Sequence, residues 1–293
     1  MELREMKYFL AVAREESISR AAQYLFITQP SLTRQIQNME REIGQPLFVR
    51  TGRKMVLTET GALLRKRAEE IMSLYDKTEA ELLRPDAAMS GDVYIGGGES
   101  YAMKLVTDAA QSVRQDYPDV RFHLYSADSY DVSERLDNGL IDFGVLVEPD
   151  DLGKYDYIRL PLTDTWGILM RKDSPLAARD SVAPEDLVGL PILCSKRVTY
   201  PGSAVRLWYG TAAELNIVAT YNLIYNASLM VKSGMGYAIG LDMLVNTDGN
   251  SDLCFRPFCP KVQTSLVIAW KKYQIFSKPA RIFLERLRAS VTE

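Results

Sequence analysis

The chain has 293 residues, 47% of them hydrophobic and 25% charged, with a net charge of −3, which is the composition of an ordinary globular protein. No apolar run reaches the roughly 18 residues of a membrane span, and the first ten residues lack a secretory pattern, so we expect a cytoplasmic protein without a membrane partner. Three cysteines and one histidine nearly exclude a Cys/His zinc set, and neither a metal nor a cofactor is expected.

The first sixty or so residues predict three short helices with a basic balance of charge. Apolar residues recur at helical spacing over 3–13, and a second helix is expected to begin near Ser19, a good N-cap. A third begins at Thr28, and its apolar face ends at Gly44 after Leu32, Ile36, Met39 and Ile43. Residues 1–67 contain twelve Lys/Arg and seven Asp/Glu, a balance of +5, which leaves −8 for the rest. A basic head on an acidic body is expected of a chain whose head alone meets phosphate.

The opposite face of the third helix carries short or forked hydrogen-bonding side chains. Arg matches the two acceptors of guanine in the major groove, and Gln or Asn matches adenine. The first turn of a recognition helix is the part that reaches base edges. This face consists of Gln29, Ser31, Thr33, Arg34, Gln35 and Asn38, and no acidic residue precedes Glu40. The pattern favours DNA recognition, and a merely polar surface is the alternative for this face alone.

Residues 46–57 predict a hairpin directly after the three helices. Two short β-prone runs flank a Thr-Gly-Arg-Lys tip. The basic tip suits contact with phosphate or with the minor groove.

Four segments together resemble the LysR-type transcriptional regulators, in the family's order and spacing: Ser19 to Ala22, Thr28 to Ile36, Leu47 to Arg50, and Leu57 to Gly61. The resemblance implies a winged helix-turn-helix DNA-binding domain at 1–58, a linker (dimerisation) helix at 59–89 and an effector-binding domain at 90–293. It implies sequence-specific binding to double-stranded promoter or operator DNA, control by a small-molecule effector, and homodimers that pair into homotetramers. RNA polymerase is a further candidate partner.

The resemblance also implies which residues of the head meet DNA. Carried over by matching position, one group meets the major groove and the other meets the backbone or minor groove from the wing. The first group is Gln29, Pro30, Ser31, Thr33 and Arg34, and the second is Arg50, Arg53 and Lys54.

One long helix is predicted from the Thr58 cap to about Arg84, where Pro85 ends it. Apolar or small residues recur in it at spacings of 4 and 3, which is typical of a coiled-coil seam. They are Leu64, Ala68, Ile71, Tyr75, Thr78 and Leu82. A narrow stripe on a single helix needs a partner, and the same helix of a second subunit is expected. Packing onto the chain's own body is the alternative.

From residue 91 onward strands alternate with helices, which predicts a parallel sheet covered by helices. Strands are expected at 93–96, 120–125, 142–147, 167–170, 191–194, 218–221, 237–239 and 266–270, with helices at 101–116, 132–138 and 279–291. The predicted architecture is two α/β lobes with crossing strands, as in the family's effector domain, which is similar to type 2 periplasmic binding proteins. Lobe I covers about 90–162 and 266–293, and lobe II about 163–265.

Ligands of open parallel sheets bind beyond the carboxyl ends of the strands. The polar residues at these ends are therefore the expected effector-binding residues: Ser100, Tyr101, Asp128, Ser129, Glu148, Thr199, Tyr200, Gly202 and Asn222. Ser100 and the helix ends suit a carboxylate, whereas Asp128 and Glu148 favour an amine or hydroxyls, so the charge of the effector is left open. A plain turn or capping role is the alternative for each residue.

Two alternative functions compete with an effector-controlled regulator. The first is a thiol redox-responsive regulator that uses Cys254 and Cys259, because the segment between them is short enough for a compact loop and Arg256 is placed to lower a thiol pKa. The second is an enzyme in the body, but no nucleophile elbow, metal set or Walker loop occurs. His123 lies mid-strand between two apolar residues, where a packed or surface histidine is expected. We therefore expect no enzymatic activity and no catalytic residue.

Overall fold

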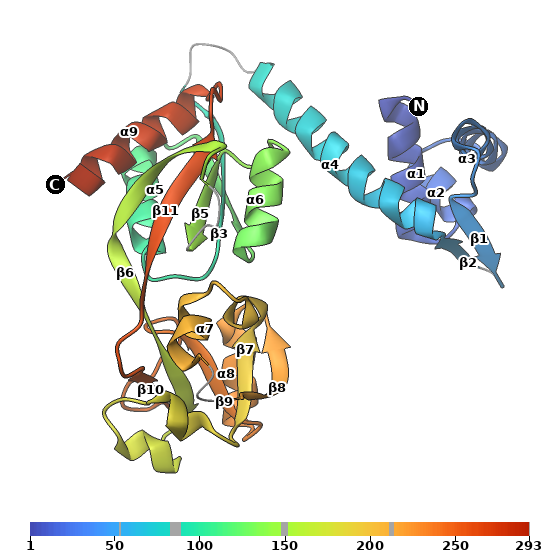
Figure 1. Cartoon of the computed structure of the whole chain (residues 1–293). Coiled ribbons are helices and arrows are strands. Elements are labelled where there is room, and N and C mark those ends of the chain that lie inside the picture. The colour runs from blue at the N-terminus through green and yellow to red at the C-terminus, as the bar shows by residue number, and fades with distance from the viewer. Residues whose placement is uncertain (53, 83–88, 148–151, 211–213, 293) are drawn as a thin grey trace. The chain divides into compact units, whose positions relative to one another are not determined.

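The computed structural model describes all residues except 53, 83–88, 148–151, 211–213 and 293 (Figure 1). The chain separates into two compact units, Met1–Arg84 and Pro85–Glu293. Across the described ranges, no helix has both the length and the apolar character that a membrane span requires.

The first unit consists of three helices, a hairpin and a long helix. In chain order these are α1 (Leu3–Glu15), α2 (Ile18–Tyr24), α3 (Gln29–Ile43), β1 (Phe48–Thr51), β2 (Lys54–Leu57) and α4 (Glu59–Leu82). One hydrophobic core joins them, in which Phe9, Leu32 and Leu47 are fully buried. The predicted tri-helical head, hairpin and long helix are therefore all present.

The second helix begins slightly earlier than the sequence predicts. Ser17 rather than Ser19 is the N-cap, because its backbone is extended and its hydroxyl oxygen accepts from the Arg20 N–H at 3.4 Å. The third helix begins and ends as predicted. The hydroxyl oxygen of Thr28 accepts from the Ser31 N–H, and Gly44 adopts a φ of 77°, which favours glycine.

The N-terminal half of α4 packs against its own head. Ala68 and Met72 are buried in the head core, and Leu64 packs against it. A Cβ on Gly61 would lie 2.1 Å from the Leu47 carbonyl oxygen, so only glycine permits this close approach. The head therefore already covers Ala68, which contradicts its prediction as part of a seam open to a second subunit, whereas Leu64 is only half-buried.

The remaining seam residues of α4 lie in the open. Exposed apolar side chains follow one side of the helix, and they include three positions of the predicted seam: Ile71, Tyr75 and Leu82, together with Leu63 and Leu74. Thr78 is also exposed, and its hydroxyl donates to the Leu74 carbonyl at 2.8 Å.

The second unit is built on a nine-stranded sheet of order β4-β3-β5-β11-β6-β9-β7-β8, with β10 paired to β6. Its elements are β3 (Gly91–Gly97), α5 (Met103–Asp116), β4 (Val120–Ser126), α6 (Ser129–Asp137), β5 (Phe143–Val147), β6 (Tyr155–Arg171), β7 (Pro191–Ser195), α7 (Ala204–Tyr209), β8 (Asn216–Tyr221), α8 (Ile224–Lys232), β9 (Tyr237–Leu241), β10 (Leu253–Pro257), β11 (Gln263–Lys271) and α9 (Lys278–Thr292). Short 3₁₀ turns lie at Pro175–Ala178, Pro184–Leu187 and Lys196–Thr199.

The sheet is mixed rather than parallel. β3 pairs in parallel with β4 and β5, and β7 with β8 and β9, as the βα order predicts. β6 and β11 run antiparallel to each other and to their other neighbours. β6 is one long strand, whereas the sequence predicts a strand only from residue 167. Pro161 interrupts the alternating pattern of this strand. In the structure the proline lies near a register shift opposite Ser265 and Val267 of β11, where a proline is tolerated.

Two groups of hydrophobic clusters lie along the sheet. In the first group α5 and α9 cover one face and α6 covers the other. In the second, α7 with the 3₁₀ turns covers one face and α8 the other. β6 and β11 run from one group to the other (Figure 1). Along β6 the first core ends at Leu162 and the second begins at Trp166, and along β11 the change falls between Val262 and Leu266. We call this position the core boundary.

Candidate nucleic-acid interface and ligand site

The first half of α3 presents most of the predicted base-reading residues to solvent. Gln29, Pro30, Ser31 and Arg34 are exposed, and Thr33 is half-buried. The Thr33 hydroxyl donates to the Gln29 carbonyl at 2.9 Å, so it is engaged within the helix. The buried residues Leu32 and Ile36 fix the helix by its opposite face.

Arg34 and Arg50 differ from the other arginines that the structure describes in the first unit. Their guanidinium groups form no hydrogen bond, ion pair or ring contact within the described residues, whereas each of the others has such a partner. These others are Arg4 over Tyr8, Arg14 and Arg20 on Glu15, Arg41 on Asn38, Arg65 on Glu69 and Arg67 on Glu70. Arg34 lies on α3 and Arg50 on β1, and both are exposed. Two forked donors are thus available to an external acceptor.

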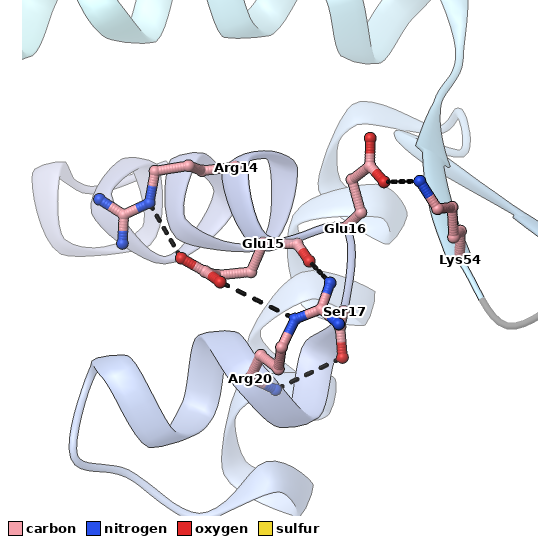
Figure 2. Close-up of polar contacts among 6 residues, drawn as sticks. All are labelled: Arg14, Glu15, Glu16, Ser17, Arg20 and Lys54. Atoms are coloured by element: carbon pink, nitrogen blue, oxygen red, sulfur yellow. Dashed lines mark hydrogen bonds and ion pairs between the residues drawn. The ribbon is translucent and has the colours of Figure 1, made fainter.

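The turn between α1 and α2 anchors the hairpin (Figure 2). The Glu16 carboxylate binds the Lys54 ammonium at 2.5 Å, and the Met55 N–H donates to the Glu16 carbonyl at 3.0 Å. The ammonium lowers the pKa of Glu16 by hydrogen bonding to its carboxylate. Lys54 is therefore paired within the head, and the predicted contact of Arg53 lies outside the described residues.

The same turn fixes the angle between the first two helices. Figure 2 shows Arg14 and Arg20 directed toward Glu15. The Arg20 guanidinium donates to the Glu15 carbonyl and lies 3.9 Å from its carboxylate, and the Arg14 Nε lies 3.1 Å from the same carboxylate. Charged hydrogen bonds at this corner hold α2, and with it the start of α3, in place.

The ends of three strands in the second unit meet, as the sequence predicts. The Ala127 N–H donates to the Gly97 carbonyl at 3.1 Å, and the Ser129 hydroxyl donates to the Val147 carbonyl at 3.4 Å. These two bonds bring the start of α6, with Ser129, to the ends of β3 and β5. Glu148, which follows Val147, lies outside the described residues.

Several predicted ligand residues use their polar atoms to cap turns. Asp128 accepts from the N–H groups of Tyr130 and Asp131 at 3.1 and 3.0 Å. The buried Ser100 accepts from the Ala102 N–H at 2.9 Å, and Thr199 donates to the Lys196 carbonyl at 2.7 Å. These three side chains therefore have the plain turn or capping role that the sequence left open as the alternative to ligand binding. The others that the structure describes, Tyr101, Tyr200, Gly202 and Asn222, are exposed.

Glu99, which is not among the predicted ligand residues, connects the two groups of elements. Its Oε2 atom accepts from the backbone N–H of Ile224, the first residue of α8, at 2.6 Å. This hydrogen bond brings the end of β3, with Ser100, to the turn before α8, with Asn222. The available sequence signal was an acidic residue directly before the predicted strand-end residue Ser100.

Asp164 and Thr264 were also missed. They are cross-strand partners on β6 and β11 at the core boundary, with only 4% and 1% of their surface exposed. Within the described structure, Asp164 Oδ2 and Thr264 Oγ1 have no hydrogen-bond partner. Burial raises the pKa of Asp164, although the Ser100 side chain and the Tyr101 N–H oppose this rise. The signal was an acidic residue at an inward position of the alternating series Leu160, Leu162, Asp164, Trp166.

The cysteines do not have the features of a redox pair. Cys254 lies in strand β10, so the predicted compact loop is wrong. Burial raises the pKa of the Cys254 thiol even though Arg256 acts to lower it, and burial raises the pKa of Cys194 to about 11. Cys259 is exposed. At Cys254, burial therefore outweighs the lowering of the thiol pKa that was expected from Arg256. Among the described residues no group of three or more His, Cys, Asp and Glu could hold a metal ion.

Two family models match the chain. The model of the bacterial regulatory helix-turn-helix protein of the lysR family matches residues 3–62, and that of the LysR substrate binding domain matches residues 86–292. Two curated relatives are 30% identical over the full length of both chains: the uncharacterized regulator YybE of Bacillus subtilis and the Hca operon transcriptional activator HcaR of Escherichia coli. The chain therefore belongs to the LysR-type transcriptional regulators. Its first unit contains the helix-turn-helix DNA-binding domain, and its second is the effector-binding domain.

Solved structures agree on the fold over the whole chain. CbnR in complex with its target DNA has a TM-score of 0.75 at 20% identity, covering 99% of this chain and 100% of that one. Full-length BenM has a TM-score of 0.53 at 25% identity, covering 100% and 97%. The similarity to CbnR extends through the helix-turn-helix, the long helix and the mixed sheet.

Proposed function

We propose that this regulator binds a two-fold-related promoter site as a dimer, and that a small-molecule effector at the core boundary changes how the DNA is held. The observation that carries the DNA-binding part is the pair of exposed, unpartnered guanidinium groups of Arg34 and Arg50. Leaving these two arginines without a partner among the described residues gains nothing for folding, whereas a guanine edge or a phosphate accepts both donors of the fork.

The residues of the head divide into two roles. Gln29 and Arg34 read base edges, because they are exposed in the first half of α3. Pro30, Ser31 and Thr33 complete the face that enters the major groove. Arg50, Arg53 and Lys54 supply affinity through phosphate or minor-groove contact, and Lys54 must exchange Glu16 for a phosphate to do so.

Dimerisation uses the exposed side of α4. The apolar residues Leu63, Ile71, Leu74 and Leu82 lie on it in the open, within the first unit. We assign the same surface of a second copy as their partner, because two apolar stripes can cover each other. Tyr75 belongs to the same exposed side, and the exposed Thr78 is the polar member of the predicted seam. Two linked heads read both halves of a site with summed free energy, and pairing of dimers into tetramers is the further step that we propose.

Effector control is proposed from the second unit. β6 and β11 join the two hydrophobic cores, and Glu99 links elements of the two groups. A ligand can shift the equilibrium between two relative positions of these groups if its affinity for the two positions differs. The ligand residues that we retain are Ser100, Tyr101, Ser129, Tyr200, Gly202 and Asn222, with Asp128 and Thr199 as supports of the local turns. We assign the chain no enzymatic activity, and a cytoplasmic location follows from its need to reach promoter DNA.

A gel-shift and footprinting experiment tests this function. The probe is the intergenic DNA beside the gene for this chain, with and without candidate metabolites, and random DNA of equal length is the control. We expect a protected site on the intergenic fragment and a changed footprint with one metabolite. Equal affinity for both DNAs, or identical footprints under every metabolite, would contradict the proposal.

A further inference from the structure

Two buried polar atoms stand side by side in the sheet register without a hydrogen-bond partner in the described structure. They are Asp164 Oδ2 on β6 and Thr264 Oγ1 on β11, whose residues are Cα partners. Native proteins rarely leave such atoms unsatisfied, and a ligand or an ordered water is the usual explanation. Their position at the core boundary places them between the two hydrophobic groups that a ligand would bring together.

Among the described residues, the groups that act on the pKa of Asp164 are hydrogen-bond donors and not cations. The groups that act on its carboxyl are the Ser100 side chain and the Tyr101 backbone N–H, and no described Lys or Arg is among them. Glu99 adds a second carboxylate next to Ser100 in the chain. A buried carboxylate without a cationic partner is unfavourable. No described Lys or Arg therefore balances a charge on the Asp164 carboxyl.

We propose that the effector presents a protonated amine to Asp164 Oδ2 and Thr264 Oγ1, so that it is a small organic cation. An ammonium group carries three donors and no acceptor, so it can satisfy both oxygens at once. The bond to the carboxylate is charge-assisted. A carboxylate effector could accept from the Thr264 hydroxyl, but it would offer Asp164 Oδ2 no donor and would repel the ionised carboxylate. This inference rests on the proposed function, because it names the chemistry of the effector.

The test uses the full-length protein and two matched ligand series. Primary alkylamines from propyl to hexyl are compared with the carboxylates of the same carbon skeleton, at constant ionic strength, by calorimetry and thermal shift. We expect at least one amine to bind the wild type, and Asp164→Asn to weaken that binding at least tenfold. Asp156→Asn is the matched control, since Asp156 lies exposed on the same strand and should leave binding unchanged.

Thr264→Val keeps the test decisive if Asp164→Asn does not fold. Valine has nearly the shape of threonine, so we expect the fold to persist. Because the hydroxyl is lost, amine binding should become severalfold weaker. Preferential binding of the carboxylates, failure of every amine to bind, or equal amine binding by all variants would overturn the inference. Equal amine binding by all variants is the result expected if the two oxygens are hydrogen bonded only to water.

Footprinting separates this inference from the proposed function. If a carboxylate alters the footprint and binds Asp164→Asn as well as the wild type, the inference of an amine effector is wrong, but the proposed control by an effector is supported. An amine that depends on Asp164 but never alters the footprint supports the binding site and counts against effector control.

Discussion

Glu99 and Ile224 are 125 positions apart in sequence, yet the Glu99 carboxylate accepts from the first N–H of α8 at 2.6 Å. The bond joins the end of β3, in the first group of elements of the second unit, to a helix of the second group. An anion at a helix N-terminus is favourable because free N–H groups and the helix dipole meet it there. Glu99 therefore stabilises the arrangement in which the two groups are in contact.

Replacing Glu99 with glutamine should loosen this contact. The neutral amide loses the charge-assisted bond, and we expect a cost of about 1 kcal/mol. Hydrogen exchange should be faster at the amide of Ile224 in Glu99→Gln. Glu285→Gln, on the exposed side of α9, is the control. Equal protection of Ile224 in both variants would mean that Glu99 does not hold α8.

Arg34 and Arg50 should affect DNA binding in different ways. Arg34→Ala should lower affinity for the operator by about 1–3 kcal/mol and affect random DNA less, because a base contact is lost. Arg50→Ala should weaken both DNAs equally and reduce the salt slope by about 1, because a phosphate contact is lost. Both are measured by fluorescence anisotropy across a salt series.

Arg41→Ala is the control for these two variants. Arg41 lies on the same α3 helix, but its guanidinium is already bound to Asn38. Its removal should change affinity little. Equal losses for operator and random DNA in Arg34→Ala would show that Arg34 contacts the backbone and does not read sequence.

A charge in the exposed stripe of α4 should separate the subunits. Ile71→Glu buries a carboxylate in the proposed helix pair, so sedimentation should show monomers and DNA binding should become much weaker. Ser73→Glu adds the same charge on another exposed side of the helix and should keep the dimer. Persistence of the dimer in Ile71→Glu would exclude this stripe as the interface.

Asp164 should make stability depend on pH in a direction opposite to that of a paired carboxylate. Burial raises its pKa in the folded protein, so the folded state retains a proton that the unfolded state has lost. The free energy of unfolding therefore falls as pH rises from the ordinary value near 3.8 through the raised value. Asparagine cannot ionise, so the stability of Asp164→Asn relative to wild type should increase over this interval and then level off.

Asp137 provides the contrasting control for this measurement. Lys154 and Tyr155 hydrogen bond to its carboxylate, and its pKa is lowered despite the opposing effect of burial, which is the largest single influence. Asp137→Asn should therefore lose stability relative to wild type above the ordinary pKa, and the loss should disappear as pH falls through the lowered value. Denaturant titrations from pH 3 to pH 7 measure both differences. A pH-independent difference for Asp164→Asn would contradict the raised pKa.

The head could be predicted closely because its signals are local. Thr28 and Gly44 mark the two ends of α3, and both act through atoms within a few residues. Ser17 and Ser19 are equally good caps by type, and only the backbone conformation distinguishes them. The burial of Ala68 could not be foreseen, because a stripe on a helix does not say which surface covers it.

The second unit was harder to predict because its decisive contacts are long-range. Pro161 concealed the continuity of β6, which depends on pairing with β11 a hundred residues later. The acidic Glu99 is visible directly before Ser100, but nothing in the local sequence names Ile224, 125 positions away, as its partner. Asp164 could have been selected, since a carboxylate at an inward position of an apolar alternation is either neutralised or bound to a partner.

The most direct test of the account is a hydroxyl-radical footprint of the full-length protein on the promoter fragment, repeated with Ile71→Glu. We predict two protected patches related by two-fold symmetry and separated by one helical turn, about 10–10.5 base pairs, or a multiple of it. Both patches should fade together in the variant, because the heads bind as a pair. A single patch that is unchanged in Ile71→Glu would contradict paired recognition by the two heads.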